Sequence, residues 1–590
     1  MKRYLAVILF SLTMACSAAA IDREAFTITR YQLDVQIDRA SHVMAVTGQV
    51  TLRNDSKLPQ KYATLQVSSS LSWNGIALDR QPLEWIGNDY TSDIDHTGGL
   101  SEGVVTLPKE VPPGGAVTLD VQYGGTVTPD ATRLTRMGVS SEIALRNDWD
   151  QISEPFTAIR GLGYVTWYPV SLPAVSMSDG NAVFDAIAAW KFRHQQTQFD
   201  ARIHVIGGDA KLCIAGNATA SSCGELSQTA DPRTGGPVNQ ISNTIHLSGL
   251  ERVVPAFSVA NYVALDHPGA TLFHTADKVT LARDYATAAE ANEAVLHDWL
   301  NPAVQVPVVI ELTDPNANSY QNGAVLFTPL RQSQLTTLEL LLLPVQVAAR
   351  FSSPHRWIED GLQRFLQAVS VERRSGRKGA LQFLDEVMAP LVKTEESADS
   401  SSGPATKPAE THPADDTLLN TSDEILLRGK GSFVFWMLRD MVGDEALQHA
   451  LAAYHPGADL KPTYFQDLLQ EGKKRDLEWF FDDWVYRNRG LPDFRVDNAY
   501  VRPLLNDPSK IVLVTVTIEN RGGAGAEVPV VIQTPSGDRI ARVLVRAHQK
   551  ASGRSQVPAA PTKVVVNDGS VPETNSNDNT FDVPATPVPQ

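Results

Sequence analysis

Hydrophobic and polar residues alternate along much of the first half of the chain. Between Thr27 and Gly249 the alternation forms short runs separated by turn residues, such as YQLDVQI, AVTGQVTLRN, GAVTLDVQYGG and NTIHLSG. Successive side chains of a strand point to opposite faces of a sheet, so these runs predict strands with one buried face. The pattern therefore predicts an antiparallel β domain over residues 21–249.

The pattern changes to a helical period near residue 250. Lys278–Leu300 carries apolar residues at helical spacing, and Thr336–Gln367 divides into two helices. The first of the two is apolar on nearly every side from Leu338 to Leu343, which indicates a buried helix that Pro344 is expected to kink. We expect a mostly helical domain over residues 250–495.

Strand patterns return near the end of the chain, in KIVLVTVTIEN, VPVVIQ and RIARVLV. They predict a C-terminal β-sandwich over residues 496–569. Two segments hold few large apolar residues, and we expect both to be disordered: a surface insertion at 393–416 and a tail at 570–590. The predicted fold class is a multidomain α+β protein.

Residues 1–20 have the composition of a secretory signal peptide. Lys2 and Arg3 precede the apolar run Leu5–Met14, and small residues follow at the cleavage positions. The run is too short to span a membrane, and no later stretch has the length and apolar character of a transmembrane helix. The protein is therefore expected to be exported, to the periplasm or outside the cell, with lipid anchoring at Cys16 as an alternative to a soluble form.

The cysteines predict a disulfide, and the net charge bears on the class of partner. Cys213 and Cys223 remain after removal of the signal. An exported pair that encloses a short polar loop is expected to form a disulfide, with two separate buried thiols as the alternative. The formal net charge of −16 disfavours nucleic acid as a partner.

The second central helix begins with a motif of known type. Trp357-Ile358-Glu359-Asp360-Gly361 resembles the W-L-N-E-G motif of the large zinc aminopeptidase family that includes membrane alanyl aminopeptidase and leukotriene hydrolase. The N-terminal strands YQLDVQID and VQYGG and the sequence WYP follow in the same order as in that family. The resemblance implies an N-terminal β domain followed by a thermolysin-like central domain. In the family, two histidines of HEXXH and the glutamate of the second motif bind zinc, and the HEXXH glutamate is the general base.

The zinc ligands are absent from the corresponding helix. Alignment without a gap from Asp360 places Thr337 and Leu341 at the two histidine positions. A shift of one residue places Leu338 and Leu342 there and keeps Glu339 at the position of the general base. Leucine offers no lone pair to a metal, so only Asp360 could bind zinc, and we expect no metal or other cofactor.

Two further positions of the family's site are altered. The family has an edge strand with the sequence G-A-M-E-N, which pairs with the substrate. Gly323 and Ala324 match its first two residues and are expected to contact substrate. Leu326 replaces the glutamate that binds the substrate's amino terminus in the family. Near Lys430, Arg428 replaces the tyrosine that stabilises the oxyanion. An arginine can still donate hydrogen bonds to a negative charge.

Two classes of function remain. The first is a non-catalytic aminopeptidase-like protein, or pseudopeptidase, that binds a peptide or a protein in a cavity between its domains. The second is an enzyme, either a residual zinc metallopeptidase or another hydrolase that uses Glu339, Asp360 and Arg428. A purely architectural role, with the cavity filled by side chains, cannot be separated from the first class by sequence.

Overall fold

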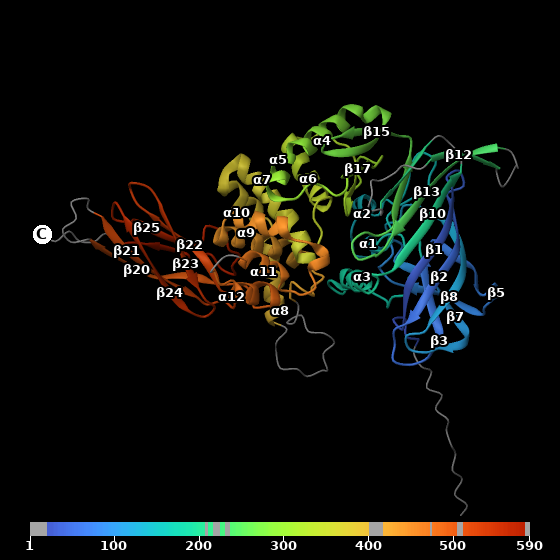
Figure 1. The fold of residues 1–590 in the computed structure, drawn as a ribbon, viewed down its shortest axis with the longest axis horizontal. Helices are drawn as coiled ribbons and strands as arrows, with labels where there is room; N and C mark the ends of the chain where they lie inside the picture. Colours follow the sequence, from blue (N-terminus) through green and yellow to red (C-terminus); the bar gives the residue numbers. More distant parts are fainter. Residues whose placement is uncertain are drawn as a thin grey trace, which may run out of the picture.

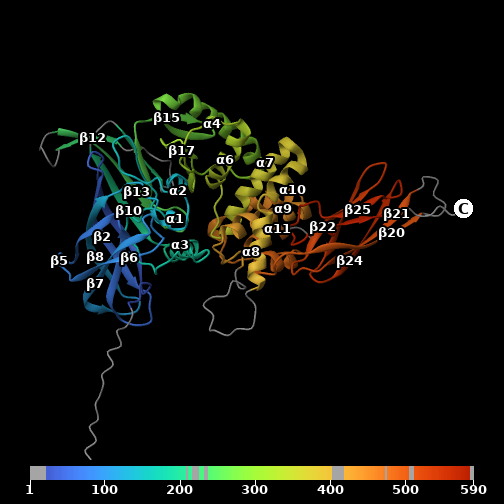
Figure 2. The ribbon, with the colours of Figure 1, turned by 180° about the vertical axis from the view of Figure 1, so that it is seen from behind.

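The computed structural model describes residues 21–206, 210–215, 225–230, 237–400, 417–471, 475–503 and 511–584. The chain belongs to the mixed α+β class, as the sequence predicts. Figures 1 and 2, drawn from opposite sides, show three regions in a row along the longest axis. N-terminal strands form one end, helices lie in the middle, and C-terminal strands form the other end. The predicted signal peptide, residues 1–20, lies outside the described residues.

An eight-stranded sheet forms most of the N-terminal region. Buried and exposed residues alternate along much of its strands β1 and β2, so the period of two that the sequence shows is the period of the buried face. A three-stranded sheet lies beside it, and the aromatic rings of Tyr31, Trp167, Tyr168 and Phe199 meet in the core. The order of the large sheet is β12 (Glu225–Ala230), β13 (Pro237–Leu247), β10 (Gln198–Ile206), β1 (Phe26–Asp38), β2 (Val43–Asn54), β8 (Ala116–Thr126), β4 (Leu71–Leu78) and β5 (Gln81–Pro82), and that of the small sheet is β3 (Gln60–Ser68), β7 (Gly99–Val111) and β6 (Trp85–Thr91).

A second three-stranded sheet completes the N-terminal region. Its order is β11 (Lys211–Ala215), β14 (Ala256–Ala260) and β9 (Thr157–Ile159), and Phe257 and Val259 of β14 belong to the N-terminal core. The predicted domain boundary at residue 249 is therefore too early. Cys213 is buried in β11, but Cys223 lies outside the described residues, so the disulfide stays a prediction. Three short helices complete this region: α1 (Thr132–Arg136), α2 (Ser141–Asn147) and α3 (Ala182–Arg193).

A five-stranded sheet links the N-terminal region to the helices. Strands β16, β17 and β19 run parallel, and the two outer strands are antiparallel to their neighbours. The order is β15 (Tyr262–His267), β16 (Ala270–Thr275), β17 (Val308–Glu311), β19 (Val325–Thr328) and β18 (Tyr320–Asn322). The 3-10 turn η1 (Ala276–Lys278) leads from β16 into α4 (Val279–Ala291), which packs on the sheet and is followed by α5 (Glu293–Trp299).

Two helices dominate the middle region, α6 (Leu335–Ala348) and α7 (Arg356–Asp385). Helix α6 continues through Pro344, and α7 changes direction at Gly376, whose φ is 70°. A methyl group on Gly361 of α7 would lie 2.7 Å from the carbonyl carbon of Gly431, so these two backbones approach closely. Beyond residue 416, the described part of the chain forms the helices and turns η3 (Ile425–Lys430), α9 (Gly431–Val442), α10 (Asp444–Ala453), η4 (Pro456–Ala458), α11 (Tyr464–Gln470), α12 (Glu478–Phe481) and η5 (Asp482–Tyr486).

The first part of the predicted disordered insertion is helical. Helix α8 (Met388–Ser400) runs eight residues into the segment that was expected to be disordered from residue 393. Glu395 on this helix is buried, and its Oε1 accepts a hydrogen bond of 2.7 Å from the buried Nζ of Lys430. The prediction was wrong for 393–400 because a long-range partner supplies the contact that composition cannot show. Residues 401–416 lie outside the described residues.

Two sheets form the C-terminal region. One has the order β20 (Phe494–Pro503), β21 (Val512–Asn520) and β24 (Lys550–Val557), and the other β23 (Arg539–Val545), β22 (Ala526–Gln533), β25 (Lys563–Val566) and β26 (Thr580–Asp582). Val571 is fully buried and β26 pairs with β25, so the expectation of a disordered tail from residue 570 was wrong for these residues. Within the residues that the structure describes, none of the helices is long and apolar enough to span a membrane.

Candidate functional site

Helix α6 carries the positions at which zinc ligands are expected, and its faces contact different parts of the protein. Leu343 and Val347 belong to the core that α7 shares. Leu338 and Leu342 belong instead to the core between α4 and the five-stranded sheet, where they are 2% and 1% exposed. Leu338 and Leu342 therefore point towards the sheet and not towards α7.

A third face of α6 carries Glu339 and Gln346. Asn292 Nδ2, at the junction of α4 and α5, donates hydrogen bonds of 2.9 Å to the backbone oxygen of Glu339 and 2.8 Å to Oε1 of Gln346. The buried Glu339 carboxylate forms an ion pair with Arg374 of α7. Glu339 thus lies between the α4–α5 junction, which its backbone contacts, and α7, whose Arg374 is the partner of its carboxylate.

The remaining face of α6 is its accessible one. Consecutive residues of an α-helix are about 100° apart around its axis, so Leu341 lies about 40° from Thr337, and Glu339 about 200°. Thr337 is exposed and Leu341 is half-buried. This placement favours the alignment without a gap, in which Thr337 and Leu341 stand at the histidine positions.

Neither alignment gives a set of side chains that fits a zinc ion. In the alignment without a gap, the two histidine positions hold the hydroxyl of Thr337 and the hydrocarbon side chain of Leu341. In the other alignment they hold Leu338 and Leu342, which are directed into a core. Tetrahedral zinc sites need imidazole, thiolate or carboxylate groups, and of these positions only Asp360 has one. Across the part of the chain that the structure describes, no group of three or more His, Cys, Asp or Glu side chains is arranged to hold a metal ion.

The first turn of α7 carries two carboxylates in a partly buried, charged environment. Burial raises the pKa of Glu359 to about 7, although Arg252, whose Nε lies 3.8 Å from Glu359 Oε2, acts in the opposite direction. Burial also raises the pKa of Asp360, and the charges of Arg356 and Arg428 oppose that rise. Asp360 Oδ2 lies 3.2 Å from Arg356 Nη2. The charge of the exposed Arg428 therefore acts on Asp360.

The N-terminal region meets the helices at this same cluster. Asn181 Nδ2, just before α3, donates a hydrogen bond of 2.8 Å to Asp423 Oδ2, just before η3. Burial lowers the pKa of Lys191 of α3 to about 8, and the charges of Arg356 and Asp360 also act on it. Figures 1 and 2 both place α3 between the N-terminal sheets and the helices. The carboxylates of α7 therefore lie at the junction of two regions.

A hydrogen-bonded network that the sequence did not reveal holds the start of α7. Ser353 Oγ lies 2.7 Å from the Tyr454 hydroxyl and accepts a hydrogen bond of 3.0 Å from the backbone N–H of His355. The Tyr454 hydroxyl in turn donates to Asp459, whose Oδ1 lies 3.3 Å from His355 Nε2. Local sequence pattern does not reveal this network, because Tyr454 comes 101 residues after Ser353 in the chain.

One of the two edge strands of the five-stranded sheet is β18, and Gly323 and Ala324 lie outside it. They form the turn between β18 and β19, where Gly323 has a φ of 59°. Leu326 lies on the inner strand β19 and is buried. Asn322 of β18 bonds to both backbone groups of Val254, accepting from its N–H at 3.2 Å and donating to its oxygen at 2.8 Å. The turn residues are therefore displaced from the strand that the resemblance assigned to substrate contact.

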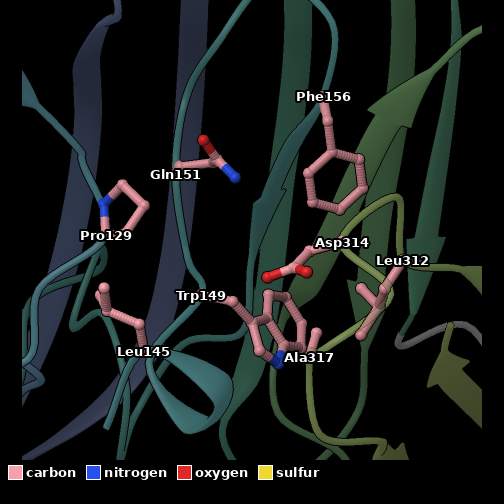
Figure 3. A pocket seen from close by; sticks show the side chains of 8 residues that line it. All are labelled: Pro129, Leu145, Trp149, Gln151, Phe156, Leu312, Asp314 and Ala317. Atoms are coloured by element: carbon pink, nitrogen blue, oxygen red, sulfur yellow. The ribbon is translucent and has the colours of Figure 1, made fainter. Parts of the chain in front are cut away.

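A small pocket of about 150 Å³ lies where the N-terminal region meets the loop between β17 and β18. Figure 3 shows Trp149 and Ala317 on one side, Phe156 and Gln151 on the opposite side, and the Asp314 carboxylate between them. Mostly apolar side chains line it: Pro129, Leu145, Trp149, Gln151, Phe156, Leu312, Asp314 and Ala317. None of these residues was identified from the sequence, because the lining comes from two segments that only the fold brings together.

A larger and more polar pocket of about 920 Å³ lies between the helices and the C-terminal sheets. Arg489, Arg521 and Arg546 line it together with Glu395, Asp483 and Asp493. Arg521 is paired with Asp578 at 3.2 Å, and Asp483 Oδ2 accepts a 3.0 Å hydrogen bond from the backbone of Gly525. Side chains of both charge signs therefore line this pocket.

Comparison with known proteins places this geometry in context. No family model matches the chain, and no curated protein matches it. Among solved structures, the crystal structure of Legionella pneumophila aminopeptidase A in complex with aspartic acid is similar, with a TM-score of 0.55 and 11% sequence identity over 93% of the present chain. The chain has an aminopeptidase-like fold. It spans 59% of the Legionella protein's chain, and at this identity the likeness concerns the fold alone.

Proposed function

We propose that this protein is an exported, non-catalytic member of the zinc aminopeptidase class that includes membrane alanyl aminopeptidase and leukotriene hydrolase, and that it binds a peptide or a protein. One observation carries the proposal: the accessible face of α6 offers Thr337 and Leu341, while Leu338 and Leu342 are buried in hydrocarbon. A catalytic zinc needs three protein ligands and an open position for water. The side chains present support a binding role better than hydrolysis through zinc.

The distance between Glu339 and Asp360 also supports a binding role. Glu339 pairs with Arg374, which follows Asp360 by 14 residues on α7. At a rise of about 1.5 Å per residue, the two positions on α7 are separated by roughly 21 Å along the helix axis. Glu339, Asp360 and Arg428 are therefore a poor set for one hydrolytic site.

A second candidate function rests on Glu359. A carboxyl whose pKa is about 7 can give or take a proton near neutral pH, and Ser353 and Tyr454 lie on the same polar network at the start of α7. A metal-independent hydrolase using Glu359 as its acid or base is the alternative that this observation favours. Glu359 lies at the junction of the helices with the N-terminal region, where a ligand bound between the two regions would contact it.

Elemental analysis combined with hydrolysis assays on the purified mature protein tests the proposal. We expect less than about one-tenth of a zinc ion per chain, against one per chain for a catalytic site, and no cleavage of aminoacyl amide substrates. Near-stoichiometric zinc that a chelator removes together with aminopeptidase activity would overturn it. Chelator-resistant hydrolysis that is lost in Glu359→Gln would instead establish the second candidate.

A further inference from the structure

The small pocket of Figure 3 has the size of one amino-acid side chain. Its volume of about 150 Å³ is that of a buried cavity that accepts benzene, and it is well below the roughly 300 Å³ at which pockets for drug-sized ligands begin. Trp149, Phe156 and Leu312 supply much of the wall. Burial of an apolar group is therefore the interaction that this space can provide.

The inner wall of the pocket is fixed before any ligand binds. Trp149 Nε1 donates a hydrogen bond of 3.1 Å to the backbone oxygen of Asn318, and the guanidinium of Arg160 lies 3.8 Å from the centre of the Trp149 ring. Arg160 is itself held by a buried ion pair with Asp150. Arg331 donates to the backbone oxygens of Pro315 and Ala317, which braces the loop on the other side. A preformed wall lowers the entropy cost of binding.

The mouth of the pocket is accessible and combines apolar surface with a carboxylate. Leu145 of α2 lines the pocket and is 38% exposed. Asp314 is exposed and directs its carboxylate towards the pocket in Figure 3, while its Oδ1 accepts a 2.8 Å hydrogen bond from the backbone N–H of Asn316. The chain as a whole carries a net charge of −16. A ligand with a positive charge beside its apolar group complements this mouth.

We infer that this pocket anchors a peptide by one apolar side chain, no larger than that of phenylalanine, next to a positively charged group that meets Asp314. The inference rests on the proposed function, because it names the peptide chemistry that such a binding protein would recognise. The apolar side chain provides the affinity through burial against Trp149 and Phe156. The carboxylate provides selectivity for a cation over a neutral or acidic neighbour.

Calorimetric titration with defined peptides tests the inference. The probe is acetyl-Gly-Phe-Lys-Gly-amide, compared with the same peptide carrying Ala for Phe, or Gln or Glu for Lys. We expect the Ala peptide to bind at least about tenfold more weakly, since burial of a phenylalanine side chain contributes that factor or more. The Gln peptide should bind about two- to fivefold more weakly, as expected for a solvent-exposed ion pair.

Two protein variants locate the binding. Leu145→Trp fills the mouth and should abolish binding of the Phe peptide, whereas Asp314→Asn should remove the preference for Lys over Gln and keep the preference for Phe over Ala. Leu460→Trp and Asp538→Asn, at exposed positions remote in sequence, are the matched controls. Thermal unfolding of each variant verifies that it is folded.

The outcomes separate the inference from the proposed function. No binding of the Phe-Lys peptide, or binding that Leu145→Trp leaves unchanged, overturns the anchor pocket and leaves the non-catalytic assignment intact. Stoichiometric zinc with hydrolysis overturns the assignment even if the peptide binds here. Equal affinity for the Lys, Gln and Glu peptides overturns the role of Asp314.

Discussion

Leu338 and Leu341 lie close together on α6 and pack on the same core, but they differ in exposure, and this difference decides which of them can tolerate a polar side chain. Leu338 is 2% exposed in the core beneath the five-stranded sheet, whereas Leu341 is half-buried. Leu338→His should lower the free energy of unfolding by about 3 kcal/mol or more, because it combines lost burial with an unpaired imidazole. Leu341→His should cost about 1 kcal/mol. Urea unfolding of both variants measures the difference.

Equal losses in the two variants would mean that Leu341 is as deeply buried as Leu338, and they would remove the basis for choosing between the alignments. If the difference is found, a variant that joins Leu338→His and Leu342→His with Asp360→Glu should unfold instead of gaining zinc. The alignment that keeps Glu339 at the general-base position would then lose its support.

The carboxyl of Glu359 should make stability depend on pH. Burial raises its pKa from the ordinary 4.5 to about 7, so the protonated form favours the folded protein. This contribution is complete below about pH 4.5 and is lost as the pH rises through about 7. Glu359→Gln keeps a neutral side chain, so the variant should become progressively more stable than the parent protein between these values. Urea unfolding at a series of pH values measures the trend.

Glu386→Gln, at a carboxylate whose side chain is 65% exposed, is the control for this series. A stability difference between Glu359→Gln and the parent protein that stays constant from pH 4.5 to 7 would contradict the burial of Glu359.

At the scale of elements, the crossing of α7 and α9 depends on the absence of a side chain. A methyl group at Gly361 would lie 2.7 Å from the backbone of Gly431, so the two helices would have to separate. Gly361→Ala should therefore destabilise the protein by about 1–3 kcal/mol, although alanine is the better helix former. Gly457→Ala, where a methyl group meets nothing within 4 Å, is the control and should change the midpoint of thermal unfolding little. A neutral or stabilising Gly361→Ala would show that the helices lie farther apart.

Helix α8 depends on its buried ion pair. Removal of one partner leaves the other charged and buried, so Lys430→Met or Glu395→Leu alone should cost about 3–5 kcal/mol. The double variant should recover most of that loss, because two apolar groups replace both charges. Thermal unfolding of the three variants measures the coupling.

The exposed ion pair Lys461–Asp467 is the control for the buried ion pair of α8. Its side chains are 63% and 47% exposed, so Lys461→Met should cost under about 1 kcal/mol. Similar losses at the two pairs would mean that Glu395 is in contact with solvent.

The hydrophobic pattern of the sequence predicted those strands and helices that depend on residues close together in the chain. The alternation in β1 and β2 and the amphipathic start of α7 are set by neighbours in the sequence. The extent of α8 was missed because Glu395 finds its partner 35 residues further along the chain. The alignment on α6 could not be decided because its run of leucines offers similar side chains in either position. The network around Tyr454 and the pocket at Trp149 arise only from tertiary contact.

At the scale of the whole molecule, the hydrophobic cores predict how the protein unfolds. One core includes both the helices of the middle region and the C-terminal sheets, and a separate core fills the N-terminal region. Trp484 Nε1 donates a 2.8 Å hydrogen bond to the backbone oxygen of Gly525, which joins the helices to the C-terminal sheets. The helices and C-terminal sheets should therefore unfold as one cooperative unit, distinct from the N-terminal region.

Differential scanning calorimetry tests this division. Leu438→Ala in α9 and Val530→Ala in β22 should lower the midpoint temperature of the same unfolding transition. Val205→Ala in β10 should lower the midpoint temperature of a different one. All three residues are at most 1% exposed, so the substitutions are matched in burial. A shift of one common transition by all three variants would mean that the two cores unfold together.

The contact between Asn322 and Val254 also bears on self-association. An outer strand with unpaired backbone groups is a template on which a second chain can add a strand and begin aggregation. Here β18 is only three residues long, and the Asn322 side chain fastens it to a segment of its own chain through two hydrogen bonds. The β18 edge of the five-stranded sheet consequently presents little of the regular backbone ladder that strand addition between molecules requires.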